Sequence, residues 1–181
     1  TGVYKARELD IPNGDLKGKV AALDYLTASN RLSFGDKVEE FETGTFNASG
    51  KKVVVIGGGD TAMDCVRTAV RQGATSVKCL YRRDRANMPG SQREVQNAEE
   101  EGVIFEWLTS PKGFSNQLIN TELLNLEAQE GDLKGIIVQK MRLGDPDATG
   151  RRTPEEIKGS QYLEEADLVI EALGFEPENL P

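Results

Sequence analysis

Three consecutive glycines separate an apolar segment from a helical one, in a pattern that suits a phosphate-containing ligand. The run Gly57-Gly58-Gly59-Asp60-Thr61-Ala62 fits G-x-G-x-x-G/A through Gly57, Gly59 and Ala62. In this pattern the first glycine permits a tight turn, the second lets a pyrophosphate approach the backbone, and the small third residue lets helix and strand pack closely. The free N–H groups and positive dipole end of the helix attract the anion. We predict that residues 57–62 bind the pyrophosphate of a dinucleotide.

A glycine-rich turn that binds nothing is the alternative interpretation, and the flanking strand and helix make it the weaker one. Asp60 and Asp64 stand near the start of the helix. An acidic side chain there stabilises the positive end of the helix dipole. We therefore expect these two carboxylates to support the helix rather than to act as catalysts.

A cluster of arginines follows the next apolar segment. Arg82, Arg83 and Arg85 stand where NAD-specific domains place an acidic residue, about 20 residues beyond the glycines, to bind the ribose 2′-hydroxyl. Guanidinium groups suit the geometry and charge of a 2′-phosphate, which a carboxylate would repel. The cluster predicts binding of NADP(H) rather than NAD(H). A solvated charge run is the alternative, and Asp84 would bind a ribose hydroxyl if the strand ended later, which leaves dual specificity open.

Composition restricts the remaining chemistry. The chain has 181 residues, no histidine and a net charge of −8. The acidic balance argues against nucleic acid as a partner, because neutralising phosphates needs a basic face. The lack of histidine removes the commonest general base and the commonest metal ligand. We predict no catalytic residue and no metal site within this chain.

The two cysteines and the apolar segments indicate the cellular compartment of the protein. Cys65 and Cys79 lie in apolar runs and form no CxxC pair, so we expect neither a disulfide nor an iron–sulfur site here. Free buried cysteines fit a reducing cytoplasm. No apolar run approaches the roughly 20 residues that a membrane span needs. We predict a cytoplasmic protein with no membrane partner.

The elements that position these residues form a regular alternation. The periodicity predicts a strand over 52–56, a helix over 61–72 closed by Gly73, and a strand over 77–81. A capping box at Ser91–Glu94 predicts a helix towards Gly102, followed by a strand over 103–108. Because crossovers between parallel strands are right-handed, this is a parallel βαβαβ unit.

The segments on either side complete the expected domain. Apolar spacing over 16–32 predicts an amphipathic helix, and 34–50 an acidic surface connection. Residues 121–128 and 133–143 are interpreted as antiparallel strands about a turn at Gly131-Asp132, followed by a polar loop over 145–158 and a strand over 167–172 ending at Gly174. We predict one α/β domain over 1–181, Rossmann-like and three-layered. Residues 1–50 form an N-terminal helix and connection, and 51–181 a parallel core with an antiparallel β-meander.

With these residues identified, the sequence resembles the small (beta) subunit of NADPH-dependent glutamate synthase. The similar segments are Val54–Asp64, Tyr81–Arg85, Asn87–Ser91, Arg93–Val95, Glu100–Val103 and Ala172–Phe175. The loop from Tyr81 to Ser91 is the most specific of them.

The resemblance implies an NADPH domain inserted into an FAD domain, with Thr1-Gly2 and Ala172–Gly174 as the crossing points. Hydride would pass from nicotinamide to FAD, and electrons would continue through iron–sulfur clusters to a large subunit that makes glutamate. The chain carries one glycine fingerprint. We therefore expect a fragment of a larger flavoprotein, inactive by itself, whose partners are the FAD domain of the same parent chain and the large subunit. FAD and the clusters belong to that parent. The resemblance also places Gly174 near the nicotinamide and Pro111 near the cofactor.

Three other interpretations remain. The chain would be the NADPH-binding domain of a related flavoprotein oxidoreductase, or a non-catalytic NADP(H)-sensing module. A self-sufficient dehydrogenase is disfavoured, because no lysine follows Tyr162 at helical spacing and the chain has no histidine.

Overall fold

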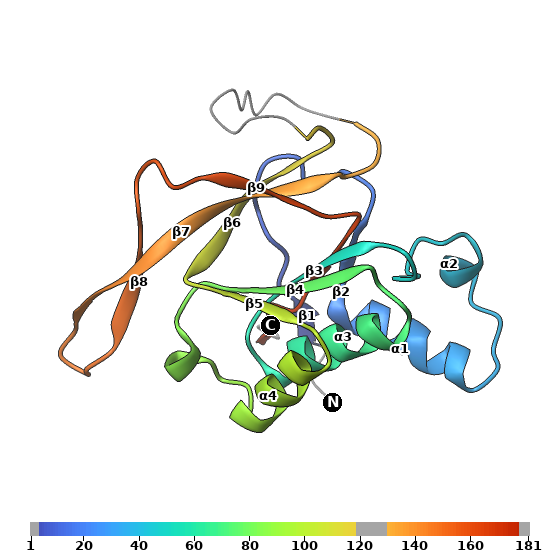
Figure 1. The fold of residues 1–181 in the computed structure, drawn as a ribbon, viewed down its shortest axis with the longest axis horizontal. Coiled ribbons are helices and arrows are strands. Elements are labelled where there is room, and N and C mark those ends of the chain that lie inside the picture. The colour runs from blue at the N-terminus through green and yellow to red at the C-terminus, as the bar shows by residue number, and fades with distance from the viewer. Residues whose placement is uncertain (1–3, 119–129, 178–181) are drawn as a thin grey trace.

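The computed structural model describes residues 4–118 and 130–177 and has three layers (Figure 1). A parallel sheet forms the middle layer, and the order of its strands is β2 (Lys19–Ala21), β10 (Leu168–Glu171), β3 (Lys52–Ile56), β4 (Ser76–Tyr81) and β5 (Ile104–Trp107). Helices cover one of its faces and an antiparallel sheet covers the other. The predicted Rossmann-like three-layer class is confirmed.

The central strands are buried on both faces, which explains their continuous apolar sequence. In β3 (Lys52–Ile56), Val53 and Val55 pack with the helices, whereas Val54 and Ile56 pack against the antiparallel layer. The same alternation holds in β10 (Leu168–Glu171), which pairs in parallel with β3. Strands buried on both faces are typical of parallel sheets. The remaining strands of this sheet are β2, β4 and β5.

The two crossover helices lie where the sequence predicts them. Helix α3 (Asp60–Arg71) buries one face against the sheet, and Gly73 follows it with a φ of +87°. Helix α4 (Gln92–Glu100) begins after Ser91, but the Ser91 side chain makes no capping hydrogen bond. The predicted capping box is therefore wrong, although the helix begins where it was expected. The Glu94 carboxylate accepts a hydrogen bond from Arg67 Nη1 at 2.7 Å instead.

The N-terminal region differs from its prediction. The expected helix over 16–32 is a short strand, β2 (Lys19–Ala21), followed by α1 (Ala22–Ser33). Strand β2 pairs in parallel with β10, and its Val20 lies in the helix-side core. The three residues of β2 are too few to show the two-residue period of a strand. The helical spacing of the apolar residues around them therefore predicted a helix instead. A short helix, α2 (Glu39–Glu42), lies within the expected acidic connection.

The antiparallel layer is also larger than the sequence predicts. Strand β7 (Gly135–Pro146) pairs with β6 (Thr109–Ser115), β8 (Arg152–Glu156) and β9 (Tyr162–Glu165). The predicted strand over 121–128 lies outside the described residues. The predicted loop over 145–158 is wrong, since β7 extends into it and β8 lies within it. Most β8 side chains are exposed, so the segment lacks the apolar alternation that would reveal a strand.

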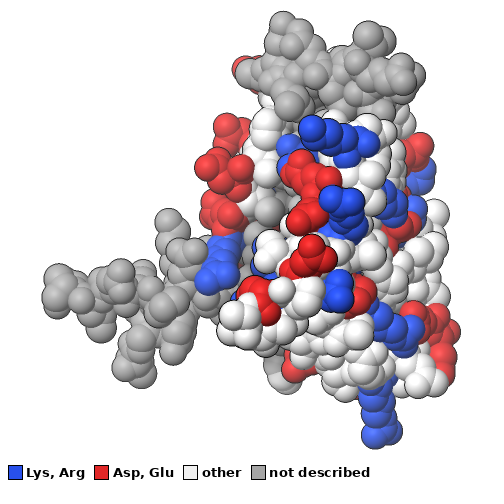
Figure 2. Space-filling view, turned by 90° about the vertical axis from the view of Figure 1, so that its left-hand side faces the viewer, with Lys and Arg blue, Asp and Glu red and all other residues white. Residues whose placement is uncertain are grey.

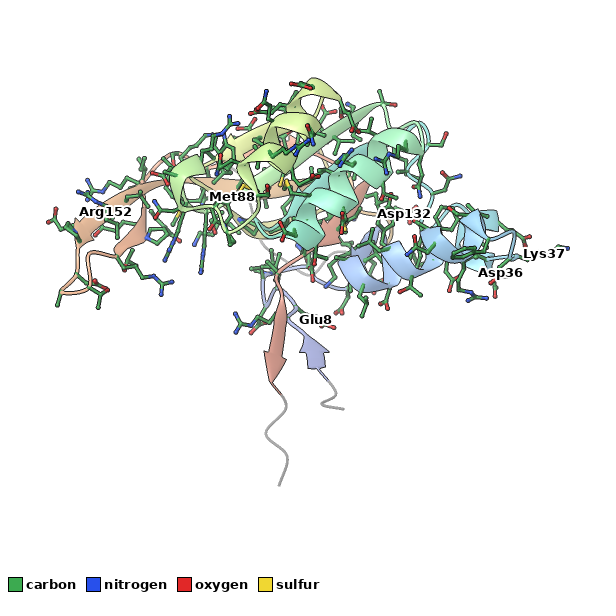
Figure 3. All side chains as sticks on the ribbon, turned by 90° about the horizontal axis from the view of Figure 1, so that it is seen from below. Glu8, Asp36, Lys37, Met88, Asp132 and Arg152 are labelled. Carbon is green, nitrogen blue, oxygen red and sulfur yellow. The ribbon has the colours of Figure 1, made fainter. Side chains whose placement is uncertain are left out.

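The first and last described segments lie together. Strand β1 (Tyr4–Ala6) pairs antiparallel with β11 (Phe175–Pro177), and this two-stranded ribbon projects from the body of the domain (Figure 3). Next to the ribbon, the Arg7 N–H donates to the Gly174 carbonyl at 3.0 Å. The first and last described segments therefore lie beside each other at one place on the domain.

Candidate dinucleotide-binding cleft

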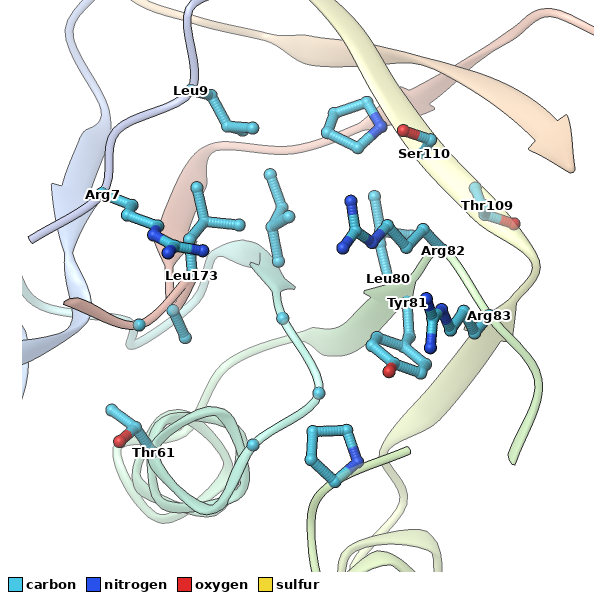
Figure 4. Close-up of a pocket in the computed structure, with 18 of the residues that line it drawn as sticks. Arg7, Leu9, Thr61, Leu80, Tyr81, Arg82, Arg83, Thr109, Ser110 and Leu173 are labelled. Atoms are coloured by element: carbon cyan, nitrogen blue, oxygen red, sulfur yellow. The ribbon is translucent and has the colours of Figure 1, made fainter. Parts of the chain in front are cut away.

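A cleft of about 900 Å³ lies at the carboxyl end of the parallel sheet (Figure 4). It is lined by residues that follow β3, β4 and β10, by the start of β6, and by the segment after β1. The chain continues from β3 through α3 to β4, whereas β10 lies on the other side of β3. Ligands of open α/β sheets bind at such a switch point, where the strand order reverses.

The glycine turn forms the floor of this cleft and fits a pyrophosphate. Gly57 has a φ of +144°, a backbone conformation that favours glycine. A Cβ on Gly58 would stand 2.5 Å from the Tyr81 ring. A Cβ on Gly59 would meet no atom within 4 Å, and Gly59 immediately precedes α3. Open space at a helix N-terminus is the environment in which phosphates bind.

The predicted turn residues divide into two groups. Gly57, Gly58, Gly59 and Thr61 line the cleft, as does Gly174 in the segment after β10. Asp60 and Ala62, in contrast, are not among the lining residues. Ala62 is fully buried in the helix-side core.

Asp60 connects the turn to the loop before α4. Its carboxylate accepts a hydrogen bond from the Ser91 N–H at 3.2 Å, and the Gly90 N–H donates to the Gly58 carbonyl at 2.8 Å. A Cβ on Gly90 would stand 3.0 Å from that carbonyl oxygen. The loop therefore supports the outer side of the glycine turn.

Arg82 and Arg83 line the cleft beyond the end of β4, where their side chains lie side by side (Figure 4). Within the described part of the chain, neither guanidinium has an ion-pair partner, and the buried Nε of Arg83 has no hydrogen-bond partner. Unpaired guanidinium groups facing a cleft fit an anionic ligand.

The other two charged residues of this loop have partners. Arg85 donates to Gln92 at 3.2 Å and to Glu99 at 3.0 Å, and it does not line the cleft. Asp84 accepts hydrogen bonds from the N–H and Nδ2 of Asn87, at 3.0 and 2.6 Å. Asp84 thereby caps the short 3₁₀ helix η1 (Arg85–Asn87).

Sequence reasoning missed two further arginines of the cleft. Arg7 reaches it from the segment after β1, and Arg151 from the connection between β7 and β8. Pro111, at the start of the antiparallel layer, also lines the cleft. No local pattern marks Arg7 or Arg151, because tertiary structure alone brings these segments to the sheet edge.

Basic residues do not dominate the exposed surface around this end of the molecule. On the face shown in Figure 2, lysines and arginines are interspersed with acidic side chains. The net charge of the chain is −8. Four arginines therefore line the cleft of a chain that is acidic overall.

The cysteines support the core rather than the chemistry. Burial raises the pKa of the Cys65 thiol well above its usual range and that of Cys79 to about 12. Cys79 donates from Sγ to the Gly57 carbonyl at 3.3 Å. Over the described ranges, no group of His, Cys, Asp and Glu side chains is arranged to hold a metal ion. No helix in these ranges is long and apolar enough to cross a membrane.

The fold and the cleft together define the class of protein. The family model of pyridine nucleotide-disulphide oxidoreductases matches residues 1–180, so the chain belongs to this family. Among its relatives is the putative glutamate synthase [NADPH] small chain of Cereibacter sphaeroides, which is 65% identical over 100% of this chain. The glutamate synthase [NADPH] small chain of Azospirillum brasilense is 60% identical, also over 100% of this chain.

These relatives are longer proteins. The chain spans 40% of the Cereibacter protein and 35% of the Azospirillum protein. Among solved structures, Mycobacterium tuberculosis FprA in complex with NADPH superposes with a TM-score of 0.71. That likeness covers 99% of this chain and 50% of FprA, at 18% identity, and it shows a shared fold.

Proposed function

We propose that this chain binds NADP(H) in preference to NAD(H) and presents its nicotinamide to FAD held by another domain of a longer glutamate synthase small subunit. The observation that carries the proposal is the pair Arg82 and Arg83 at the end of β4, whose guanidinium groups have no ion-pair partner among the described residues. They face the cleft that begins at the glycine turn. Two relatives more than half identical to this chain carry NADPH in their names, which supports the same cofactor here.

Each part of the cleft suits one part of the cofactor. The N-terminus of α3 and the open side of Gly59 would hold the pyrophosphate. Arg82 and Arg83 would hold the 2′-phosphate, and Gly174 would lie beside the nicotinamide. NADPH supplies a hydride when bound, so the residues of this chain need to bind and orient it rather than to exchange protons.

The ribbon of β1 and β11 supports a second domain. A domain inserted into another must leave and rejoin it at neighbouring points, and these two strands are paired. The FAD domain of the parent chain would join the ribbon. In the parent, electrons would pass from FAD through iron–sulfur clusters to the large subunit, in the cytoplasm.

A comparison of cofactors tests the proposal. Calorimetric titration of this chain should show tighter binding of NADPH than of NADH. A hydrogen bond to a charged group contributes roughly 1.5–3 kcal/mol, less where water screens it, so two contacts predict very roughly a 100-fold preference. Exchanging both Arg82 and Arg83 for alanine should weaken NADPH binding by about one to two orders of magnitude and leave NADH affinity nearly unchanged.

Arg85→Ala is the matched control, because this arginine stands in the same loop but pairs with Glu99. It should change neither affinity by more than about twofold, in keeping with an exposed ion pair outside the cleft. Equal losses for both cofactors in the double variant would support the solvated charge run instead. A preference for NADH in the unchanged chain would overturn the proposal.

A further inference from the structure

The hairpin of β7 and β8 extends beyond the parallel sheet, on the side where β4 ends (Figure 1). Its strands pair from Met141 opposite Glu156 to Pro146 opposite Arg152, with a register shift between Leu143 and Pro146. Such an irregularity bends a hairpin. Residues 147–151 form its tip, and Arg151 lines the same cleft as Arg82 and Arg83.

Backbone hydrogen bonds connect the base of this hairpin to the arginine end of the cleft. The Leu108 N–H donates to the Arg83 carbonyl at 3.0 Å, and the Met141 N–H donates to the Leu108 carbonyl at 2.7 Å. Met141 is also the β7 residue at which pairing with β8 begins. The hairpin therefore starts from the end of β4, whereas Gly174 and Arg7 lie beyond β10.

The hairpin tip holds Arg151 in a defined backbone position. Asp147 Oδ1 accepts hydrogen bonds from the Thr149 N–H at 2.8 Å, the Thr149 hydroxyl at 2.6 Å and the Arg151 N–H at 3.0 Å. The Asp147 N–H in turn donates to the Arg151 carbonyl at 2.9 Å. An Asx-type loop closed in this way fixes the backbone of Arg151 and so limits the directions in which its side chain can point.

The charges nearby leave the Arg151 guanidinium available for a ligand. Among the described residues it makes no side-chain hydrogen bond and no ion pair, whereas its neighbour Arg152 donates to the Gly144 carbonyl at 3.3 Å. The acidic residues of β8 are already paired, Glu155 with Arg142 and Glu156 with Lys112. Only the charge of Asp147 acts on Arg151 from within the tip.

We infer that Arg151 is a third arginine for the 2′-phosphate, reaching it from the antiparallel layer while Arg82 and Arg83 reach it from β4. This inference rests on the proposed function. A 2′-phosphate has three terminal oxygens, and two adjacent residues of one strand end approach it from one side. A cation from another element covers oxygens that these two leave open, and so makes selectivity depend on the β7–β8 hairpin as well as on the loop after β4.

Two adenosine fragments isolate this contact, because they lack the nicotinamide. In calorimetric titrations, Arg151→Ala should weaken the binding of 2′,5′-ADP about three- to tenfold, as expected for a partly screened charged contact. The binding of 5′-ADP, which has no 2′-phosphate, should stay the same. Arg152→Ala is the matched control and should change neither, and thermal unfolding of both variants checks that the hairpin is retained.

The outcomes separate the inference from the proposed function. Equal losses of 2′,5′-ADP and 5′-ADP in Arg151→Ala would overturn the inference, because they would place the guanidinium on the adenine or the pyrophosphate. A result for Arg151→Ala equal to that for Arg152→Ala would also overturn it. Either result for Arg151→Ala would leave the proposed function standing, provided that the unchanged chain preferred 2′,5′-ADP and lost this preference in Arg82→Ala. If the unchanged chain did not distinguish the fragments, both would fail.

Discussion

The carbonyl oxygen of Ala172 lies 2.2 Å from the point where a Cβ on Gly57 would stand. Ala172 follows β10 and Gly57 follows β3, so this contact joins the carboxyl ends of two neighbouring strands. The Ala172 N–H also donates to the Ile56 carbonyl at 2.8 Å. The turn that begins the cleft is therefore packed against the strand that ends near Gly174.

Gly57→Ala should destabilise the fold. The new methyl group would collide with the backbone of Ala172, and alanine would have to adopt the φ of +144°. Overpacking and backbone strain together predict a loss of about 2–4 kcal/mol in the free energy of unfolding. Urea denaturation measures it. Gly35→Ala is the control for left-handed backbone alone, since Gly35 has a φ of +86° and open space around it. Equal losses in the two variants would contradict the role of the Ala172 contact.

Gly59→Val should have the opposite effect: it should weaken NADPH binding and leave the free energy of unfolding nearly unchanged. Gly59 has a φ of −90°, which valine adopts readily, and no atom lies within 4 Å of its Cβ position. The valine side chain would occupy the space proposed for the pyrophosphate. We expect affinity for NADPH to fall at least about 100-fold, equivalent to about 2.8 kcal/mol. Calorimetry and denaturation on the same preparation give both quantities. An unchanged affinity would mean that the phosphates bind elsewhere.

The purified chain should not oxidise NADPH at a steady rate. Its single glycine fingerprint is assigned to the nicotinamide cofactor, which leaves no second one for FAD. The cysteines are buried with raised pKa values, so neither offers a reactive thiolate to accept hydride or electrons. The decay of NADPH absorbance with an artificial electron acceptor is the measurement. Turnover in a preparation free of flavin would contradict this expectation.

Local patterns predicted the central part of the fold well, because its signals lie in short stretches of sequence. The β-branched run of β3, the glycines after it and the periodicity of α3 each reflect contacts within one βαβ unit. The position of Arg82 and Arg83 at the end of β4 follows from the same unit. Whether they bind the 2′-phosphate stays a prediction.

The rest depends on contacts between distant segments. Strand β2 pairs with β10, which comes almost 150 residues later, and an exposed strand such as β8 carries no apolar period. Arg85 and Arg82 look equivalent in the sequence, and the positions of Gln92 and Glu99 on α4 separate them. The hydrogen bond from the Asn87 N–H to Asp84 spans only three residues and follows a common Asx pattern. The sequence alone could therefore have predicted that Asp84 caps this short helix.

Glu171 is a buried carboxylate at the end of β10. Only 5% of the residue is exposed, and its Oε1 has no hydrogen-bond partner within the described ranges. Lys19 Nζ lies 3.7 Å from that oxygen. Burial raises the pKa of Glu171 above its ordinary value of 4.5, while Lys19 and the Leu9 N–H act to lower it and Glu8 to raise it. Burial is the largest of these effects.

A raised pKa in the folded state gives stability a definite pH dependence. The folded chain then holds the Glu171 proton more tightly than the unfolded chain does, so the free energy of unfolding falls as the pH rises above the ordinary glutamate pKa. Glu171→Gln removes this titration. We expect the variant to gain stability relative to the unchanged chain between pH 4 and pH 7, measured by urea denaturation at each pH. Glu40→Gln, at an exposed position on α2, should show no such gain. If instead the unchanged chain gained on Glu171→Gln as the pH rose, the ion pair with Lys19 would outweigh burial, and the assigned direction of the pKa would be wrong.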